Sequence, residues 1–162
     1  MNYVIATSRP WNEVLVQRLE EATGDRFYLI NRKEDLTVER LREITPRYVF
    51  FPHWSYLIPA EIHGVYECVI FHMTDLPYGR GGSPLQNLIL RGHSTTQISA
   101  LRCVEEVDAG PVVVQLIPAG HRVELVENDR REEVLGRVIP HVGLAAFPVE
   151  VARHPRARGW CL

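Results

Sequence analysis

The stretch CVIFHMTDLPYGRGGSPLQ, residues 68–86, decides the fold of this chain. Its first four residues are apolar and are followed by His72, as at the end of a buried strand. Glycines and prolines then indicate a loop, and Ser83-Pro84 predicts a helix start because serine caps helices and proline suits the first helical position. The triplet DAG follows at residues 108–110. This order predicts a His/Asp site on the loops of an α/β sheet.

Short apolar runs and helical patterns alternate on either side of this stretch. Strands are expected at 3–6, 27–30, 48–51 and 68–71, with helices at 14–22 and 37–44 and a helical turn at 58–62. Beyond them we expect a helix at 83–90, strands at 97–104 and 112–117, and a last helix at 127–138. Continuous apolar strands between helices predict a mainly parallel sheet with helices on both faces. Ligands bind beyond the carboxyl ends of such strands, which is where His72 stands.

The composition indicates a single globular domain over residues 1–162. With 18 basic and 20 acidic residues, nothing demands a nucleic-acid or membrane partner. No apolar run has the length of a transmembrane helix or the form of a secretory leader. Cys68, Cys103 and Cys161 are too few for a disulfide framework, and their spacing to His72 matches no zinc motif. We expect a reduced, cytoplasmic protein without a bound metal. Either a monomer or a homodimer is compatible with the sequence.

Residues 48–113 resemble the folate-dependent formyltransferases, which include methionyl-tRNA, glycinamide ribonucleotide and sugar N-formyltransferases. Members of that family carry a strand ending in Asn-x-His, a Ser-Leu-Leu-Pro loop, an Arg-Gly pair, a helix and a later Asp-x-Gly loop. Here His72 matches the histidine, residues 74–77 stand at the Ser-Leu-Leu-Pro loop, and Arg80-Gly81 match the pair. Asp108 begins the Asp-x-Gly triplet. The resemblance implies a Rossmann-like formyltransferase fold, with residues 115–162 as a divergent or truncated C-terminal part.

The resemblance also implies an activity. A formyl group would pass from 10-formyltetrahydrofolate, as co-substrate, to the amine of a small acceptor such as an amino sugar, an amino acid or a hydroxylated ornithine. His72 would move protons, because histidine exchanges them near neutral pH, and Asp108 would orient and stabilise it. The implied folate-binding residues are Phe51, Trp54, Ser55, Tyr56, Leu57, Met73, Thr74, Gly82, Val104, Glu105, Glu106 and Val107.

The chain departs from the family at Ile70, where members carry the asparagine that donates to the oxyanion. Loss of one such donor typically lowers the rate by about 10²–10³-fold. Thr74, Gln86 and Asn87 are the nearby side chains able to donate in its place. Two other functions stay open: hydrolysis of formyl-folate, and a regulatory module that binds folate or another ligand without turnover.

Ser8 and Arg9 precede the first expected helix. Ser8 fits an N-cap, with Pro10 as the first helical residue. Because helix N-termini attract anions, Ser8 and Arg9 are also candidates for binding an anionic group of the acceptor, and both interpretations stay open. Arg80 is expected to brace its loop by a salt bridge or by bonds to the backbone.

Overall fold

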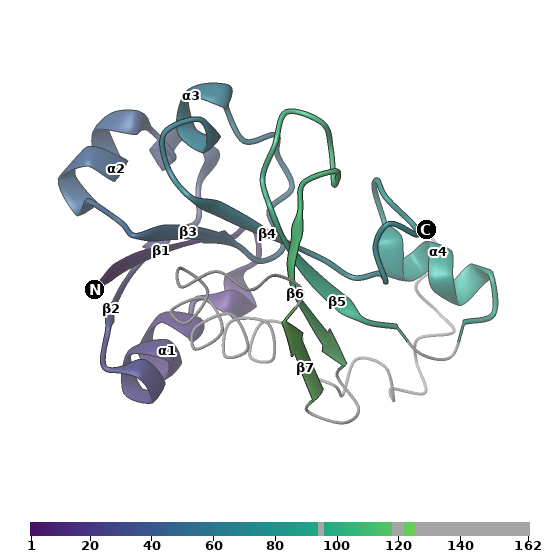
Figure 1. The fold of residues 1–162 in the computed structure, drawn as a ribbon. Coiled ribbons are helices and arrows are strands. Elements are labelled where there is room, and N and C mark those ends of the chain that lie inside the picture. Colours follow the sequence, from purple (N-terminus) through teal and green to yellow (C-terminus); the bar gives the residue numbers. More distant parts are fainter. Residues whose placement is uncertain (94–95, 118–121, 126–162) are drawn as a thin grey trace.

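A seven-stranded sheet in the order β2-β1-β3-β4-β5-β6-β7 runs through the computed structural model, which describes residues 1–93, 96–117 and 122–125 (Figure 1). The strands are β1 (Asn2–Ala6), β2 (Arg26–Ile30), β3 (Tyr48–Phe51), β4 (Cys68–His72), β5 (Ile98–Arg102), β6 (Val112–Ile117) and β7 (Arg122–Leu125). Strands β2, β1, β3 and β4 are parallel, whereas β5, β6 and β7 are each antiparallel to the preceding strand. The expected α/β fold is confirmed, with the parallel order confined to its first half. The helix expected at 127–138 and Cys161 lie outside the described residues.

Helices cover both faces of the sheet, as expected. They are α1 (Leu15–Thr23), α2 (Val38–Ile44), α3 (Ala60–His63) and α4 (Pro84–Leu90), with 3₁₀ turns η1 (Pro10–Asn12) and η2 (Lys33–Asp35). In Figure 1, α1 lies below the sheet and α2 and α3 lie above it. Among the described helices, none combines the length and the apolar character that crossing a bilayer would need.

Two apolar clusters form the core, one on each face, because alternate strand residues point to opposite sides of a sheet. We call them the α1 cluster and the α2 cluster. The α1 cluster joins Leu15 and Leu19 of α1 to Tyr3 and other buried strand residues. The α2 cluster joins Leu41 of α2 and Ile62 of α3 to the other strand faces. Burial on both faces explains why the central parallel strands are largely apolar.

Local signals explain where some helices begin and end. The Thr37 hydroxyl caps α2 by accepting from the Arg40 amide at 3.1 Å, and Gly24 ends α1 with a left-handed φ of 72°. The expected Ser8 cap is wrong, because Pro10 starts a separate 3₁₀ turn before α1. Ser83 occupies the N-cap position of α4, but its side chain makes no cap bond.

Ser8 instead ties two segments of the chain together. Its hydroxyl accepts from the Ser55 amide at 3.0 Å, and its own amide donates to the His53 carbonyl at 3.2 Å. The connection after β1 is therefore fixed to the segment after β3, at the carboxyl ends of both strands.

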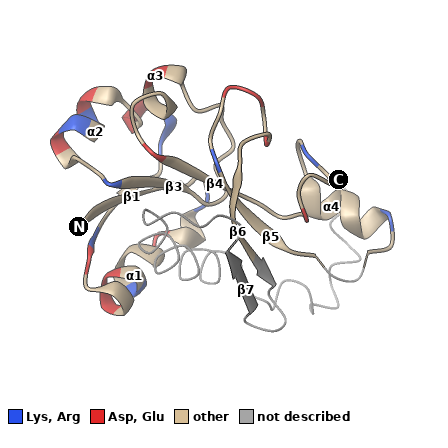
Figure 2. Ribbon diagram, in the orientation of Figure 1, with Lys and Arg blue, Asp and Glu red and all other residues tan. Residues whose placement is uncertain are grey.

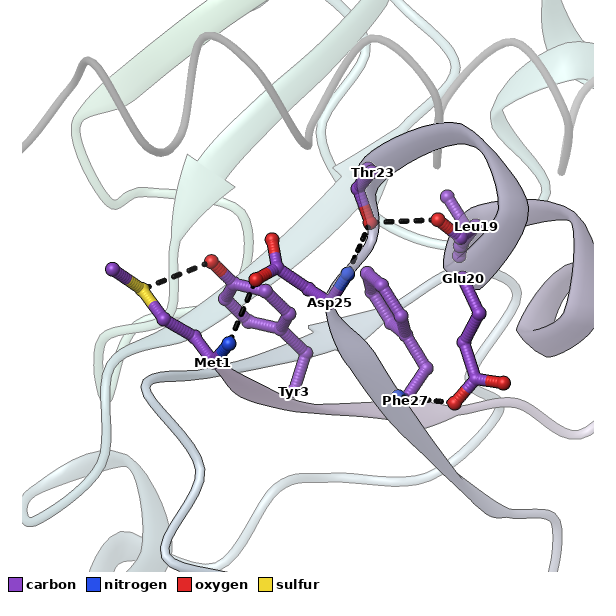
Figure 3. Close-up of polar contacts among 7 residues, drawn as sticks. All are labelled: Met1, Tyr3, Leu19, Glu20, Thr23, Asp25 and Phe27. Carbon is purple, nitrogen blue, oxygen red and sulfur yellow. Dashed lines mark hydrogen bonds and ion pairs between the residues drawn. The ribbon is translucent and has the colours of Figure 1, made fainter.

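Polar contacts fasten the turn between α1 and β2 (Figure 3). The Thr23 hydroxyl accepts from the Asp25 amide at 3.2 Å, and the Glu20 carboxylate accepts from the Phe27 amide at 3.0 Å. The Met1 ammonium group lies 2.7 Å from the Asp25 carboxylate. These contacts hold β2 beside β1 at the edge of the sheet.

Candidate active site

His72 is the last residue of β4 and is only 6% exposed. Its Nδ1 lies 3.4 Å from Oδ2 of Asp108, which the loop between β5 and β6 brings back towards the end of β4. This return depends on Gly110, where a Cβ would collide with the carbonyl oxygen of Arg102. The structure therefore places the predicted histidine and aspartate side by side, 36 positions apart in sequence.

The loop between β4 and α4 closes against this pair. His72 Nε2 lies 2.7 Å from the Gly79 carbonyl oxygen, and the Gly81 amide donates to Oδ2 of Asp108 at 3.0 Å. Both ring nitrogens of His72 thus face acceptors, and a neutral imidazole has one N–H to donate. Gly79 and Gly81 were not expected as contacts, since a backbone atom leaves no mark on a sequence pattern.

An ion pair braces the same loop from outside. Arg80 lies 3.6 Å from Glu106 on the β5–β6 loop, so the salt bridge expected of Arg80 is confirmed. Figure 2 shows the blue segment of the loop between β4 and α4 and the red β5–β6 loop on the same side of the molecule. The pair is exposed, and such pairs stabilise a fold by about 0–1 kcal/mol.

Ser99 anchors the start of the loop from beneath. It pairs with His72 across β4 and β5 and is fully buried. Its hydroxyl donates to the Thr74 carbonyl at 2.7 Å and lies 3.4 Å from the Leu76 amide. Gln115 reaches Asp75 at 3.0 Å. Ser99 and Gln115 were not predicted as site residues, although a lone serine in an apolar strand that pairs with the histidine strand is a signal for such a role.

Two buried donors, one in the loop after β4 and one in the loop after β3, have no hydrogen-bond partner among the described residues: the Thr74 hydroxyl and the Trp54 indole N–H. Gly79, at a φ of 74°, packs on Thr74, because a Cβ there would lie 2.8 Å from Thr74 Cγ2. Buried donors without partners are rare in native proteins, and a bound ligand is one means of satisfying them. These two atoms fit a ligand that brings acceptor oxygens or nitrogens.

No family model matches the chain. The methionyl-tRNA formyltransferase of Campylobacter fetus is 29% identical over 87 residues, which cover 54% of this chain and 29% of that protein. The solved methionyl-tRNA formyltransferase from Clostridium thermocellum matches at 36% identity and a TM-score of 0.70, over 98% of this chain and 66% of that one. The chain belongs to the formyltransferase family.

A third protein shares the formyltransferase fold. HypX from Aquifex aeolicus, solved in complex with tetrahydrofolic acid, matches at 24% identity and a TM-score of 0.61. The match covers 99% of this chain and 27% of that one. The chain therefore spans 29% of the Campylobacter formyltransferase, 66% of the Clostridium formyltransferase and 27% of HypX.

The residues expected to bind folate do not all gather on one face. Phe51 and Trp54 belong to the α2 cluster together with Ile70, whereas Met73 packs against the α1 cluster. Thr74 is buried at the start of the loop after β4. The other expected residues lie on exposed parts of loops, namely Ser55, Tyr56, Leu57, Gly82, Val104, Glu105, Glu106 and Val107.

The three side chains expected to donate in place of the family asparagine differ in environment. Thr74 is buried with its hydroxyl unpaired. Gln86 and Asn87 are exposed on α4, and Asn87 donates to the Gly82 carbonyl at 3.2 Å. Thr74 is therefore the expected donor that lies nearest in sequence to His72 and is already dehydrated.

Two cysteines lie on neighbouring strands near the site: Cys68 on β4 and Cys103 directly after β5, joined by a backbone hydrogen bond of 2.9 Å. Burial, together with the nearby Asp108 carboxylate, raises the pKa of the Cys103 thiol. Burial, followed by the charges of Cys103 and Glu67, raises the pKa of Cys68 well above its usual range. Both thiols are free and neutral near pH 7, a state that disfavours nucleophilic chemistry. The described residues contain no group of three side chains arranged to hold a metal ion.

Ser8 and Arg9 line a cavity of about 280 Å³ beyond the ends of β1 and β2. The remaining lining residues are Pro10, Glu13, Asn31 and Arg32. The charged groups of the lining are the guanidinium groups of Arg9 and Arg32 and the carboxylate of Glu13, which accepts from the Asn31 amide group at 3.2 Å. Arg32 also lies 3.8 Å from the exposed carboxylate of Glu34. Two arginines suit a phosphate or a carboxylate.

Proposed function

We propose that this chain transfers a formyl group from 10-formyltetrahydrofolate to the amine of a small acceptor. The observation that carries the proposal is the His72–Asp108 pair, 3.4 Å apart at the carboxyl end of β4, in a member of the formyltransferase family. The tetrahydrofolic acid in the complex of HypX, a protein of the same fold, supports a folate co-substrate.

Formyl transfer is an acyl transfer that needs proton transfer and charge stabilisation. As the acceptor amine attacks the formyl carbon, negative charge develops on the formyl oxygen, and the nitrogen must lose a proton. His72 would take that proton and return one to the departing folate nitrogen, with Asp108 stabilising the imidazolium. Nε2 would first have to leave the Gly79 carbonyl, so the loop after β4 would move as part of the reaction.

The folate would lie against the α2-cluster side of the site. Trp54, packed on the buried ring of Phe51, would form an apolar wall there, and the exposed residues 104–107 would close over the ligand from the β5–β6 loop. The Thr74 hydroxyl, buried and unpaired, would donate to the ligand, whereas Gln86 and Asn87 on exposed α4 would need that helix to shift.

The acceptor would be a small amine that carries an anionic group. Arg9 and Arg32 in the cavity beyond β1 and β2 are the cations that would bind a phosphate or carboxylate, with Ser8 beside them. A cavity of about 280 Å³ suits a small molecule better than a macromolecule.

Titration with a folate analogue, followed by assays of formyl transfer and formate release, tests the proposal. We expect saturable binding and turnover that requires an amine. Formate release without any amine would favour a formyl-folate hydrolase. Binding without either reaction would favour a regulatory module, which Ile70 and the engaged ring of His72 also motivate. A chain that binds no folate would overturn the proposal.

A further inference from the structure

The indole N–H of Trp54 is buried and has no hydrogen-bond partner among the residues that the structure describes. A buried donor left without a partner costs about 1–3 kcal/mol. Tryptophan is a donor only, so nothing but an acceptor atom can satisfy this group. Phenylalanine would fill the same apolar wall without that cost, so the N–H indicates an acceptor on the ligand.

Trp54 packs on the end of β3, the strand next to the one that carries His72. Its ring packs edge-on against Phe51, the last residue of β3, at 5.9 Å between ring centroids. Phe51 pairs with Ile70 on β4, and Ile70 packs into the same α2 cluster as Trp54. Ile70 and His72 share one face of β4, about 7 Å apart along the strand. The Trp54 ring therefore borders the face of the sheet from which His72 acts.

Acyl transfer needs donors where negative charge develops, and they are most effective in a dehydrated site. Ile70, which shares the His72 face, has no polar side-chain atom. Trp54 supplies a donor that is already dehydrated, held between Phe51 and Tyr56 by edge-on ring contacts at 5.9 and 5.4 Å. Because the indole does not ionise, its N–H can stabilise an oxyanion without giving up its proton.

We infer that the indole N–H of Trp54 is a catalytic hydrogen-bond donor to the formyl oxygen of the co-substrate. This inference rests on the proposed formyl transfer and adds a residue to it. The contact strengthens as charge develops on the oxygen, so it raises kcat more than it improves binding.

Binding is the first test, with two ligands that differ only in the formyl group: 10-formyl-5,8-dideazafolate and 5,8-dideazafolate. Trp54→Phe should weaken binding of the formylated compound by roughly three- to tenfold and leave binding of the other unchanged. In spectra of ¹⁵N-labelled protein, the Trp54 indole proton should move downfield only with the formylated ligand. The chain has three tryptophans, and the missing peak of the variant assigns Trp54.

Kinetics are the second test. Trp54→Phe should lower kcat by about 10²-fold with a much smaller change in KM for the folate. In a second variant, β-(3-benzothienyl)alanine replaces Trp54 and exchanges the N–H for sulfur in a ring of the same shape. This variant should lower kcat by the same factor. It tests the inference even if Trp54→Phe does not fold. Tyr66→Phe, at the edge of the same α2 cluster, is the matched control and should keep wild-type kcat.

Three results would overturn the inference. One is wild-type kcat in the benzothienyl variant, and another is an equal loss of affinity for both ligands, which would place the indole on the ring system of the folate. In either case the wild-type chain still transfers formyl groups, so the proposed function stands. The third is a wild-type chain that binds neither ligand, which overturns the proposed function and the inference together.

Discussion

His72 is held from both sides, by the Gly79 carbonyl at 2.7 Å and by the Asp108 carboxylate at 3.4 Å. A carbonyl oxygen only accepts, so the Gly79 contact needs a proton on Nε2. Asp108 in turn accepts the Gly81 amide, which leaves this carboxylate bonded to the loop as well as to the ring. The imidazole is therefore enclosed by these contacts, and the proposed substrate would have to displace the Gly79–Gly81 backbone to reach it.

At the residue scale, the first prediction concerns this pair. His72→Ala and Asp108→Ala should each lower formyl transfer by roughly 10²–10⁴-fold, because one removes the proton carrier and the other the group that orients it. Steady-state assays measure the loss, and circular dichroism checks that the variants fold. Asp35→Asn, an exposed carboxylate in η2, is the control and should keep full activity. Activity within twofold of wild type in either alanine variant would contradict the assignment.

At the element scale, the loop between β4 and α4 is fixed from beneath by β5. The Ser99 hydroxyl donates to the Thr74 carbonyl and lies near the Leu76 amide, two backbone groups shortly after His72. Ser99→Ala would leave the Thr74 carbonyl without this donor, in a buried position. A loss of about 1–3 kcal/mol in the free energy of unfolding is expected, measured by urea titration.

The comparison for this prediction is a serine that is exposed. Ser55→Ala should change the free energy of unfolding by less than about 0.5 kcal/mol. If Ser99→Ala were as stable as Ser55→Ala, the loop would be held by its other contacts alone.

Elements set by local signals could be predicted from the sequence, and those set by distant contacts could not. Thr37 and Gly24 act through neighbours within a turn, so the start of α2 and the end of α1 follow from the residues alone. Ser8 has the same chemistry as Thr37, but its hydroxyl binds Ser55, 47 positions away. The position of Ser99 opposite His72 likewise depends on strand pairing.

At the scale of the whole molecule, the parallel half of the sheet could be predicted and the antiparallel half could not. Apolar runs between helices imply parallel strands, but the turn that sends β5 back along β4 has no comparable signature. The His72–Asp108 pair was predicted from a resemblance in the order of motifs. The Gly79 and Gly81 contacts were missed because they are made by backbone atoms.

The last prediction links the core to pH. Cys68 is buried in β4, and burial raises the pKa of its thiol well above its usual range in the folded chain. The unfolded thiol ionises at about pH 8.5, so the neutral thiol contributes its full stability below that pH. As pH rises further, only the unfolded chain ionises, and the free energy of unfolding falls.

Cys68→Ala should remove this pH dependence. The variant loses a small apolar side chain at every pH, so its deficit in the free energy of unfolding is largest near pH 7 and should shrink between pH 8.5 and 10.5. Urea titrations of both chains across this range, under reducing conditions, measure the difference. The deficit of Cys103→Ala in the free energy of unfolding should also shrink as pH rises, but by less, because this thiol is only partly buried. A deficit that stays constant over the range would mean that the Cys68 thiol ionises in the folded chain as readily as in the unfolded one.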